Sequence, residues 1–488
     1  MNIFKKYAVL TIAVLLLNFS CTDDFEEINT DPNRIDKISP GTLLNPTLYA
    51  VSAFNMQRAE DFTFHIMQVS LPFPSASGGV HRYDVGESAG NSTWNNYYKW
   101  LNHVREMHDA AVKAKDVNYE AIALTLNAWI YSLLTDSFGD IPMEEAVRGE
   151  ERIFYPKFNT QQEVYTKILA DLERANTLFN PALPLLYGSE ILYSATADDI
   201  KDGKNIKKWR KFCNSLRMRL LLRISNKPEM NSMAKLAAMI ADPATYPVFA
   251  NNSESAILKV SGVTPNVSPW GRAIDFTTFR AAGKFFLDNL NAWDDPRRAV
   301  FNTQAKTKDG KTNIGYNGIP SGYTGSDSQF DYQPSNLNIA LVTAPMVCVL
   351  MTYAEVEFIK AELAQKDVID SDAESHYNAG VQAAMEQWNV TMPETYFEND
   401  AAAYDGTLER IMLQKYYALY FTDYQQWFEY RRTGFPTLPV TDGMLNDKKV
   451  PVRFRYPVVV QTSNADNYAK AVASMGGDDI NTKVWWEK

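Results

Sequence analysis

The chain has 488 residues, of which 45% are hydrophobic and 22% are charged, a composition typical of a soluble globular protein. Its 48 Lys and Arg face 58 Asp and Glu, and this acidic balance argues against a nucleic-acid ligand, whose phosphates require a basic face. Aromatic residues make up 12%, with 26 Tyr and 10 Trp; most are expected in the core, and the excess of Tyr leaves rings for a ligand-stacking surface.

The N-terminus predicts export. Lys5 and Lys6 precede an apolar run at residues 8–17, which is too short to span a bilayer and is typical of a secretory signal. We therefore expect residues 1–20 to be a signal peptide.

A sequence resembling a lipobox, LNFSC, follows at residues 17–21, although Asn18 stands where an apolar residue is usual. It predicts that Cys21 is the lipidated first residue of the mature chain. The alternative is ordinary signal cleavage with Cys21 as a free thiol. Residues 21–39 are polar and acidic and predict a tether, so we expect a protein anchored to a membrane by lipid rather than threaded through it.

Hydrophobic periodicity predicts a mainly α-helical domain over residues 40–488, with its helical core at 40–245 and 345–435. The expected helices are residues 43–69, 93–115, 119–134, 160–180, 207–225, 231–240, 276–293, 346–366, 371–388 and 408–433. Helix pairs joined by short turns indicate a tetratricopeptide-like scaffold, although no repeat consensus can be read.

The helix at 119–134 is apolar on almost every side, which predicts burial among other helices. Turn formers then follow within seven positions, at Asp136, Ser137, Gly139, Asp140 and Pro142. We expect this helix to end in a sharp, ordered turn. Further along, Thr160 and Glu163 predict a capping box at the start of the next helix.

Two stretches lack helical periodicity. Residues 71–91 are rich in Pro, Ser and Gly, and residues 246–344 are broken by Pro and Gly throughout, with a helix expected only at 276–293. Long ordered loops in a compact protein are usually functional, so 246–344 is predicted to face the ligand. Residues 436–488 form a closing segment.

Charged residues in the helices have structural interpretations. Arg217, Arg219 and Arg223 predict a solvated or ion-paired helix face rather than a basic binding patch. Glu355 lies among apolar neighbours. We expect it to pair with an arginine such as Arg431 or Arg432 rather than to act as a catalytic acid.

No motif for catalysis, a cofactor or a metal is present. Cys213 and Cys348 would form either one disulfide or two buried thiols, and their apolar surroundings favour thiols. His103 and His108 are wrongly spaced for two metal ligands on one helix face, and neither HExxH, G-x-S-x-G nor a P-loop occurs. The acidic residues near Gly203 fail the EF-hand spacing. We therefore predict no enzyme, no cofactor and no metal.

Several runs, in order, resemble the SusD/RagB family of outer-membrane nutrient-binding lipoproteins of the Bacteroidetes. They are FEEINTDPN at 25–33, FGDIP at 138–142, WRKFCNSLRMR at 209–219, MTYAEVEFIKAE at 351–362, QKYYAL at 414–419 with WFEYRRTGFP at 427–436, and VPVRFRYP at 450–457. Together they cover nearly the whole chain.

The resemblance implies a surface-exposed lipoprotein of the cell outer membrane that acts as a lid on a SusC-type TonB-dependent transporter. It implies capture of an oligosaccharide, or of a peptide as in RagB, and delivery to the barrel without cleavage. Aromatic rings stacking on sugar faces, with a few polar groups on hydroxyls, would form such a site.

The ligand site is predicted where the loop at residues 75–84 meets the irregular region 270–332. The residues predicted to bind are His81, Arg82, Tyr83, Trp270, Tyr316, Tyr323 and Tyr332. A helical-repeat scaffold contacting only the barrel needs no exposed aromatic cluster, and a glycoside hydrolase would need two carboxylates facing each other across a cleft.

Overall fold

The computed structural model describes residues 39–76, 78–187 and 190–488. The predicted signal peptide, Cys21 and the acidic tether lie outside these residues, except for Ser39. The helices are α3 (Pro40–Arg58), α4 (Phe64–Ile66), α5 (Asn91–Ala114), α6 (Val117–Phe138), α7 (Gln161–Leu178), α8 (Ala197–Ile200), α9 (Lys204–Arg223), α10 (Ser232–Ala241), α11 (Lys284–Ala292), α12 (Arg297–Phe301), α13 (Tyr353–Gln365), α14 (Ala373–Glu386), α15 (Leu408–Ala418), α16 (Gln425–Thr433), α17 (Val458–Ser463) and α18 (Ala465–Met475).

The strands are short and pair antiparallel. Within the described residues they form β1 (Ser70–Pro72) with β6 (Arg280–Ala282), β2 (Ser75–Ala76) with β8 (Gly325–Ser326), β3 (Ile141–Pro142) with β4 (Phe158–Asn159), β5 (Ala256–Val260) with β10 (Met346–Met351), and β7 (Lys306–Thr307) with β9 (Tyr332–Gln333). The predicted mainly α class is confirmed.

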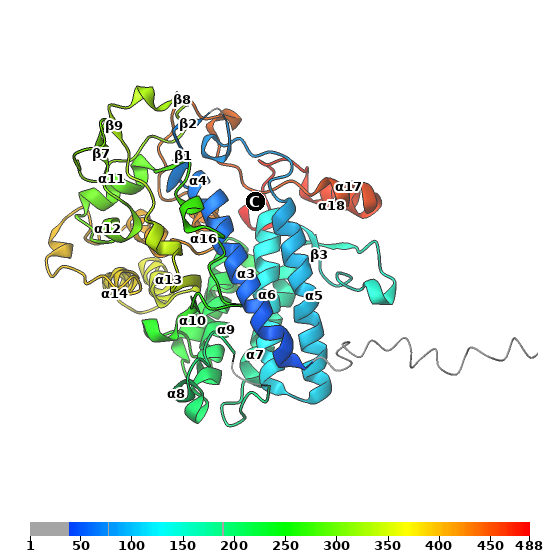
Figure 1. The fold of residues 1–488 in the computed structure, drawn as a ribbon. Helices are drawn as coiled ribbons and strands as arrows, with labels where there is room; N and C mark the ends of the chain where they lie inside the picture. Colours follow the sequence, from blue (N-terminus) through cyan, green and yellow to red (C-terminus); the bar gives the residue numbers. More distant parts are fainter. Residues whose placement is uncertain (1–38, 77, 188–189) are drawn as a thin grey trace, which may run out of the picture. The chain divides into compact units, whose positions relative to one another are not determined.

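The helices pack as neighbouring pairs. α3, α5, α6 and α7 lie side by side in that order, and α7 packs on α9 (Figure 1). α10 and α13 also pack on α9, while α13, α14 and α15 pack on one another. This arrangement confirms the predicted tetratricopeptide-like scaffold of helix pairs. No helix of the described residues is long and apolar enough to cross a bilayer.

α6 is buried among these helices, as predicted: all its residues except Val117 and Asn127 are buried. The helix continues through Asp136 and Ser137, which the sequence placed in the turn, and ends at Gly139, whose φ is +85°. Asp136 is tolerated in a buried last turn because its carboxylate accepts hydrogen bonds from other elements.

Two partners satisfy the Asp136 carboxylate. Its Oδ1 accepts from the Tyr165 hydroxyl at 2.7 Å and from the Trp486 indole nitrogen at 2.8 Å, which ties α6 to α7 and to the C-terminus. The predicted Thr160–Glu163 capping box also forms, with each side chain accepting from the other's backbone N–H.

The helix predicted at 346–366 is wrong in its first part. Residues Met346–Met351 form β10, and α13 begins after Thr352, whose side chain accepts from the Glu355 N–H at 3.1 Å. The run MVCVLM is apolar throughout, so periodicity alone does not distinguish a strand from a buried helix. Its pairing with the equally apolar β5 decides the outcome.

The single helix predicted at 408–433 is also wrong, since it is split into α15 and α16. Phe421 and Asp423, between the two, take positive φ values of 63° and 37°. Neither residue is a glycine, so the interval carries no ordinary stop signal.

The helix predicted at 276–293 is shorter than expected. Its first half contains the end of a 3-10 turn and strand β6, and α11 begins only after Gly283. Phe279, which the apolar pattern placed in the helix, has φ = 60° instead.

Buried ion pairs join α9 to the later helices. Arg219 donates from Nε and Nη2 to the Glu355 carboxylate at 2.6 and 2.5 Å, and Arg223 lies 3.1 Å from Glu429. Arg217 pairs with Glu173. The predicted ion pairing is therefore present, but this face is buried rather than solvated.

The expected partner of Glu355 is corrected as well. Arg219 of α9 pairs with Glu355 instead. Arg431 pairs with Glu487 at 2.8 Å, and Arg432 pairs with Glu362 at 2.6 Å. Cys213 and Cys348 are both free and buried, so the interpretation as thiols holds.

The Glu362 pair predicts an acid-dependent loss of stability. The burial of Glu362 opposes its ionisation, but Arg432 and its neighbours outweigh burial and hold the pKa of Glu362 at about 2, against an ordinary 4.5. A carboxyl group whose pKa is lowered by folding stabilises the fold at pH values above its ordinary pKa of 4.5. This contribution is lost as the pH falls from 4.5 towards 2. Between pH 6 and pH 3 the parent should lose about 2 kcal/mol more than Glu362→Gln. Urea unfolding of both proteins at pH 6 and pH 3 measures this difference. Equal losses of stability in the parent and in Glu362→Gln would contradict the lowered pKa of Glu362.

Candidate functional site

The two loop regions singled out from the sequence meet directly. Strand β1 pairs with β6 and strand β2 with β8, so residues 70–76 lie against 280–282 and 325–326. The Ser321 hydroxyl donates to the His81 carbonyl at 2.9 Å, and the Tyr323 hydroxyl donates to the Pro72 carbonyl. We call the surface made by residues 70–76, 78–84, 270–283 and 314–333 the loop face; its strands β1, β2 and β8 lie close together in Figure 1.

Three of the predicted binding residues belong to the interior of this region. His81 is fully buried, and burial lowers its pKa to about 4, so its imidazole is neutral at pH 7. Tyr83 is buried, with its pKa raised to about 12, and Tyr323 is buried below Phe330 at a ring distance of 5.6 Å. These rings therefore hold the loops in place and offer no free face for stacking in this structure.

Trp270 begins the 270–283 segment of the loop face, but its side chain is buried in the main core. Its indole packs edge-on against Phe276 at 5.4 Å and Phe421 at 6.4 Å. Arg82 is half-buried, and its Nε donates to the Gly443 carbonyl at 2.6 Å, which joins the loop face to the segment after α16. Both side chains are engaged in packing.

Tyr316 and Tyr332 are the predicted residues with partly exposed rings. The guanidinium of Arg298 lies 5.6 Å from the Tyr316 ring centroid. Tyr332 lies 6.0 Å from the Phe330 ring, and its hydroxyl donates to the Gly318 carbonyl at 2.8 Å. Of the seven predicted residues, these two are the ones with ring surface open to a ligand.

Sequence reasoning missed Phe279, Phe73 and Phe330. Phe279 is 76% exposed, and its backbone carbonyl accepts from the Phe73 N–H at 2.9 Å. Phe73 and Phe330 are half-buried, with ring centroids 6.3 Å apart. We call Phe73, Phe279, Phe330 and Tyr332 the aromatic row. The only sequence signal was the aromatic content of the loops, because Phe279 fell inside a predicted helix.

Exposed polar side chains accompany the aromatic row. Ser75 and Ser326 are opposite each other across the β2–β8 pair, and Ser328 lies 2.7 Å from Ser326, hydroxyl to hydroxyl. Gln329 is exposed and donates to the Ser326 carbonyl at 2.7 Å. Neutral hydroxyl and amide groups beside apolar rings can bind a ligand that has both apolar faces and hydroxyls. No group of three or more metal-ligating side chains occurs among the described residues.

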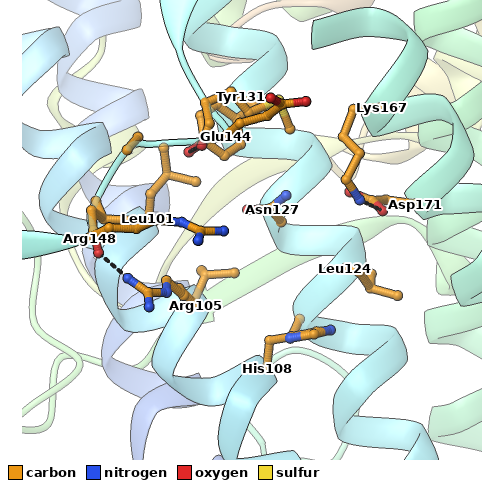
Figure 2. Close-up of a pocket in the computed structure, with 15 residues that line it drawn as sticks. Leu101, Arg105, His108, Leu124, Asn127, Tyr131, Glu144, Arg148, Lys167 and Asp171 are labelled. Carbon is orange, nitrogen blue, oxygen red and sulfur yellow. Dashed lines mark hydrogen bonds and ion pairs between the residues drawn. The ribbon is translucent and has the colours of Figure 1, made fainter. Parts of the chain in front are cut away.

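A separate cavity of about 520 Å³ lies between α5, α6 and α7 (Figure 2). Its lining includes Leu101, Leu124 and Tyr131, with Arg105 and Arg148 on one side and Lys167 with Asp171 on the other. These charges are engaged: Arg105 bonds Glu151 at 2.6 Å, Arg148 bonds Glu151 at 3.2 Å, and Lys167 pairs with Asp171. The cavity presents one buried aromatic ring, so it lacks the stacking surface of the loop face.

Solved structures share this fold. A SusD homologue from Bacteroides fragilis NCTC 9343 is 22% identical, with a TM-score of 0.77 over 93% of this chain and 100% of that one. A SusD-like protein from Bacteroides thetaiotaomicron VPI-5482 is 23% identical, with a TM-score of 0.74 over 92% and 98%. A chitin-binding protein is 22% identical, with a TM-score of 0.77 over 92% and 100%.

No curated protein matches the sequence. The model of a SusD-like family, described as starch-binding and associating with the outer membrane, matches residues 32–457. Because this match spans most of the chain and the helical scaffold agrees with it, the protein belongs to the SusD-like family.

Proposed function

We propose that the protein captures oligosaccharides at its loop face and passes them to a SusC-type TonB-dependent transporter. The observation that carries the proposal is the aromatic row, and above all Phe279, a residue that is 76% exposed on a left-handed backbone. A bulky residue at φ = 60° is strained, and strained, exposed residues concentrate at functional sites.

The chemistry of a sugar fits this surface. The C–H face of a pyranose ring is apolar and stacks on aromatic rings, while its hydroxyls bond neutral polar groups. The loop face offers both, from Phe279 and from Ser75, Ser326 and Gln329. The family description as starch-binding supports the same ligand class, and one structure with the same fold is that of a chitin-binding protein.

The place of the protein is proposed from the sequence and the family together. Lipidation at Cys21 would hold it on the outer membrane, with the chain exposed at the cell surface. The description of the family as associating with the outer membrane supports this. Peptide capture of the RagB type, or a scaffold role with contacts only to the barrel, would leave glycan binding absent.

Phe279→Ala tests the site. Truncating a central aromatic contact costs about 2 kcal/mol or more, so the Kd for a bound glycan should rise more than tenfold. The left-handed strain is the same for both residues because Ala keeps the Cβ, and Phe279 is exposed, so the thermal midpoint should stay constant. Calorimetric titration of the chain from residue 22, against a panel of plant, host and microbial glycans, measures the effect.

Phe154→Ala is the matched control. Phe154 is 67% exposed, on the loop between β3 and β4, which lies away from β7, β8 and β9 in Figure 1. The glycan affinity of the Phe154→Ala variant should equal that of the parent. Equal affinities in all three proteins would remove the aromatic row from the site, and absence of glycan binding in the parent would favour the peptide or scaffold role.

A further inference from the structure

One end of the helical layer carries exposed apolar side chains. At this end, the loop that follows α7 lies against three other elements. They are the turn between α5 and α6, the start of α3, and α8. The exposed side chains are Val112 at 47%, Leu183 at 48%, Leu186 at 67%, Tyr187 at 41% and Ile200 at 51%. We call these five residues the basal patch.

Contacts hold these residues on one surface. A Cβ on Gly41, in the first turn of α3, would lie 2.5 Å from the Cβ of Tyr187, so the loop packs directly on that turn. A Cβ on Gly203 would lie under 3.0 Å from the Pro181 carbonyl oxygen. A hollow of about 750 Å³ is lined by Leu185 and Ile200 together, which connects the loop to α8.

Polar contacts fix this loop at residues 180, 183 and 191. The Asn118 side chain donates to the carbonyls of Asn180 and Leu183 at 3.1 and 2.8 Å, and accepts from the Asn180 N–H at 2.8 Å. The Asn45 side chain accepts from the Ile191 N–H at 3.0 Å. The exposure of Leu183 and Leu186 is therefore built into the fold.

Lysines surround the basal patch. The exposed ones are Lys113, Lys115, Lys201, Lys204 and Lys207. The exposed acidic residues on the same elements are Asp109, Asp198 and Asp202; Asp116 is buried at the N-cap of α6, and Asp199 caps α8 and lies 3.8 Å from Lys208. Five exposed positive charges against three exposed negative ones leave +2 here, although the whole chain carries −10. Apolar side chains ringed by lysines are the composition of surfaces that bind anionic membranes.

The chain enters the fold at the same end. α3 begins at Pro40, and Gly41 in its first turn touches Tyr187. The proposed lipid anchor at Cys21 precedes Pro40 by only 19 residues. An anchored chain therefore holds the basal patch near the bilayer at a high effective concentration, so a weak interaction suffices.

We propose that the basal patch rests on the anionic surface of the membrane that carries the lipid anchor. Leu183, Leu186 and Tyr187 enter the headgroup region, and the lysines face lipid phosphates. The inference rests on the proposed membrane anchoring but not on the identity of the glycan. It gives the anchored protein a defined orientation, with the end where α3 begins towards the lipid.

Binding of the protein without its acyl chains to lipid vesicles measures the contribution of the basal patch separately from that of the lipid anchor. The chain from residue 22 is sedimented with phosphatidylcholine vesicles and with vesicles that contain half phosphatidylglycerol, at 25 and 300 mM salt. We expect binding to the anionic vesicles that falls several-fold at the higher salt, as screening predicts. Leu183→Asp with Leu186→Asp should lower the partition coefficient at least tenfold.

The matched control is Val458→Asp with Val459→Asp. These α17 side chains are 53% and 57% exposed, and α17 lies far from α8 in Figure 1. They should leave partitioning unchanged, and both double variants should keep the parent's glycan affinity, which separates this test from that of the proposed function. Absent vesicle binding by the parent, or equal loss in the two variants, would overturn the proposal. The proposal would also be overturned if the Leu183–Leu186 double variant still bound vesicles but no longer co-purified with the transporter. That result would make the basal patch a protein interface.

Discussion

Replacing Arg432 with Met should lower the free energy of unfolding by about 3–5 kcal/mol, because it leaves buried carboxylates without their main partner. The Arg432 guanidinium donates to both oxygens of Glu362 at 2.7 and 2.6 Å and to Glu429 at 2.7 Å. Both carboxylates are buried, so water does not replace the lost charge. Burial opposes the ionisation of Glu362, and Arg432, together with Lys366 at 2.6 Å, outweighs burial and holds its pKa at about 2.

Urea unfolding followed by tryptophan fluorescence measures the loss. The control is Arg298→Met, whose ion pair with Asp294 has side-chain exposures of 27% and 82%; its effect should stay below about 1 kcal/mol. Adding Glu362→Leu to Arg432→Met should recover much of the stability, since an apolar pair replaces an uncompensated charge. Equal effects of Arg432→Met and Arg298→Met would show that the buried network contributes little.

Gly283→Ala should destabilise the fold by about 2–4 kcal/mol and weaken glycan binding at least tenfold. A Cβ at this position would lie under 3.0 Å from the backbone carbonyl of Gln68, and Gly318 approaches Gly283 from another side. The Gly283 N–H also donates to the Val69 carbonyl at 2.8 Å. Because backbone rather than a flexible side chain blocks the methyl group, the strand pairing that supports Phe73 and Phe279 must shift.

Gly271→Ala is the control within the same loop region, because no heavy atom lies within 4 Å of its Cβ position. Its stability should stay within about 0.5 kcal/mol of the parent. Thermal unfolding and glycan titration of both variants give the comparison. A Gly283→Ala protein with parental stability and affinity would show that the loop junction tolerates displacement.

The helical scaffold was predictable where local signals agree with packing. α6 is apolar all round and is buried, and α7 begins at the capping box read from Thr160 and Glu163. The strand at Met346–Met351 was not predictable, because an apolar run is compatible with both secondary structures until its partner β5 is known. The break between α15 and α16 depends on left-handed backbone at Phe421 and Asp423, which carries no glycine or proline signal.

The candidate site was predictable as a region but not residue by residue. The loops containing Ser75 and Tyr323 do come together, as expected from their composition. Which ring faces solvent depends on tertiary packing: Tyr83 and Phe279 both have positive φ, yet Tyr83 is buried and Phe279 is exposed. Likewise, the apolar neighbours of Glu355 identified it as a structural carboxylate, but its partner Arg219 lies 136 residues away in the chain.

A crystal structure of the protein with the tightest glycan from the binding panel tests the central claim most directly. The account predicts a sugar ring stacked on Phe279, with hydroxyls bonded to side chains of the loop face, while Tyr83 and His81 remain buried. Sugar density in the cavity between α5, α6 and α7, or at any surface away from the aromatic row, would contradict it.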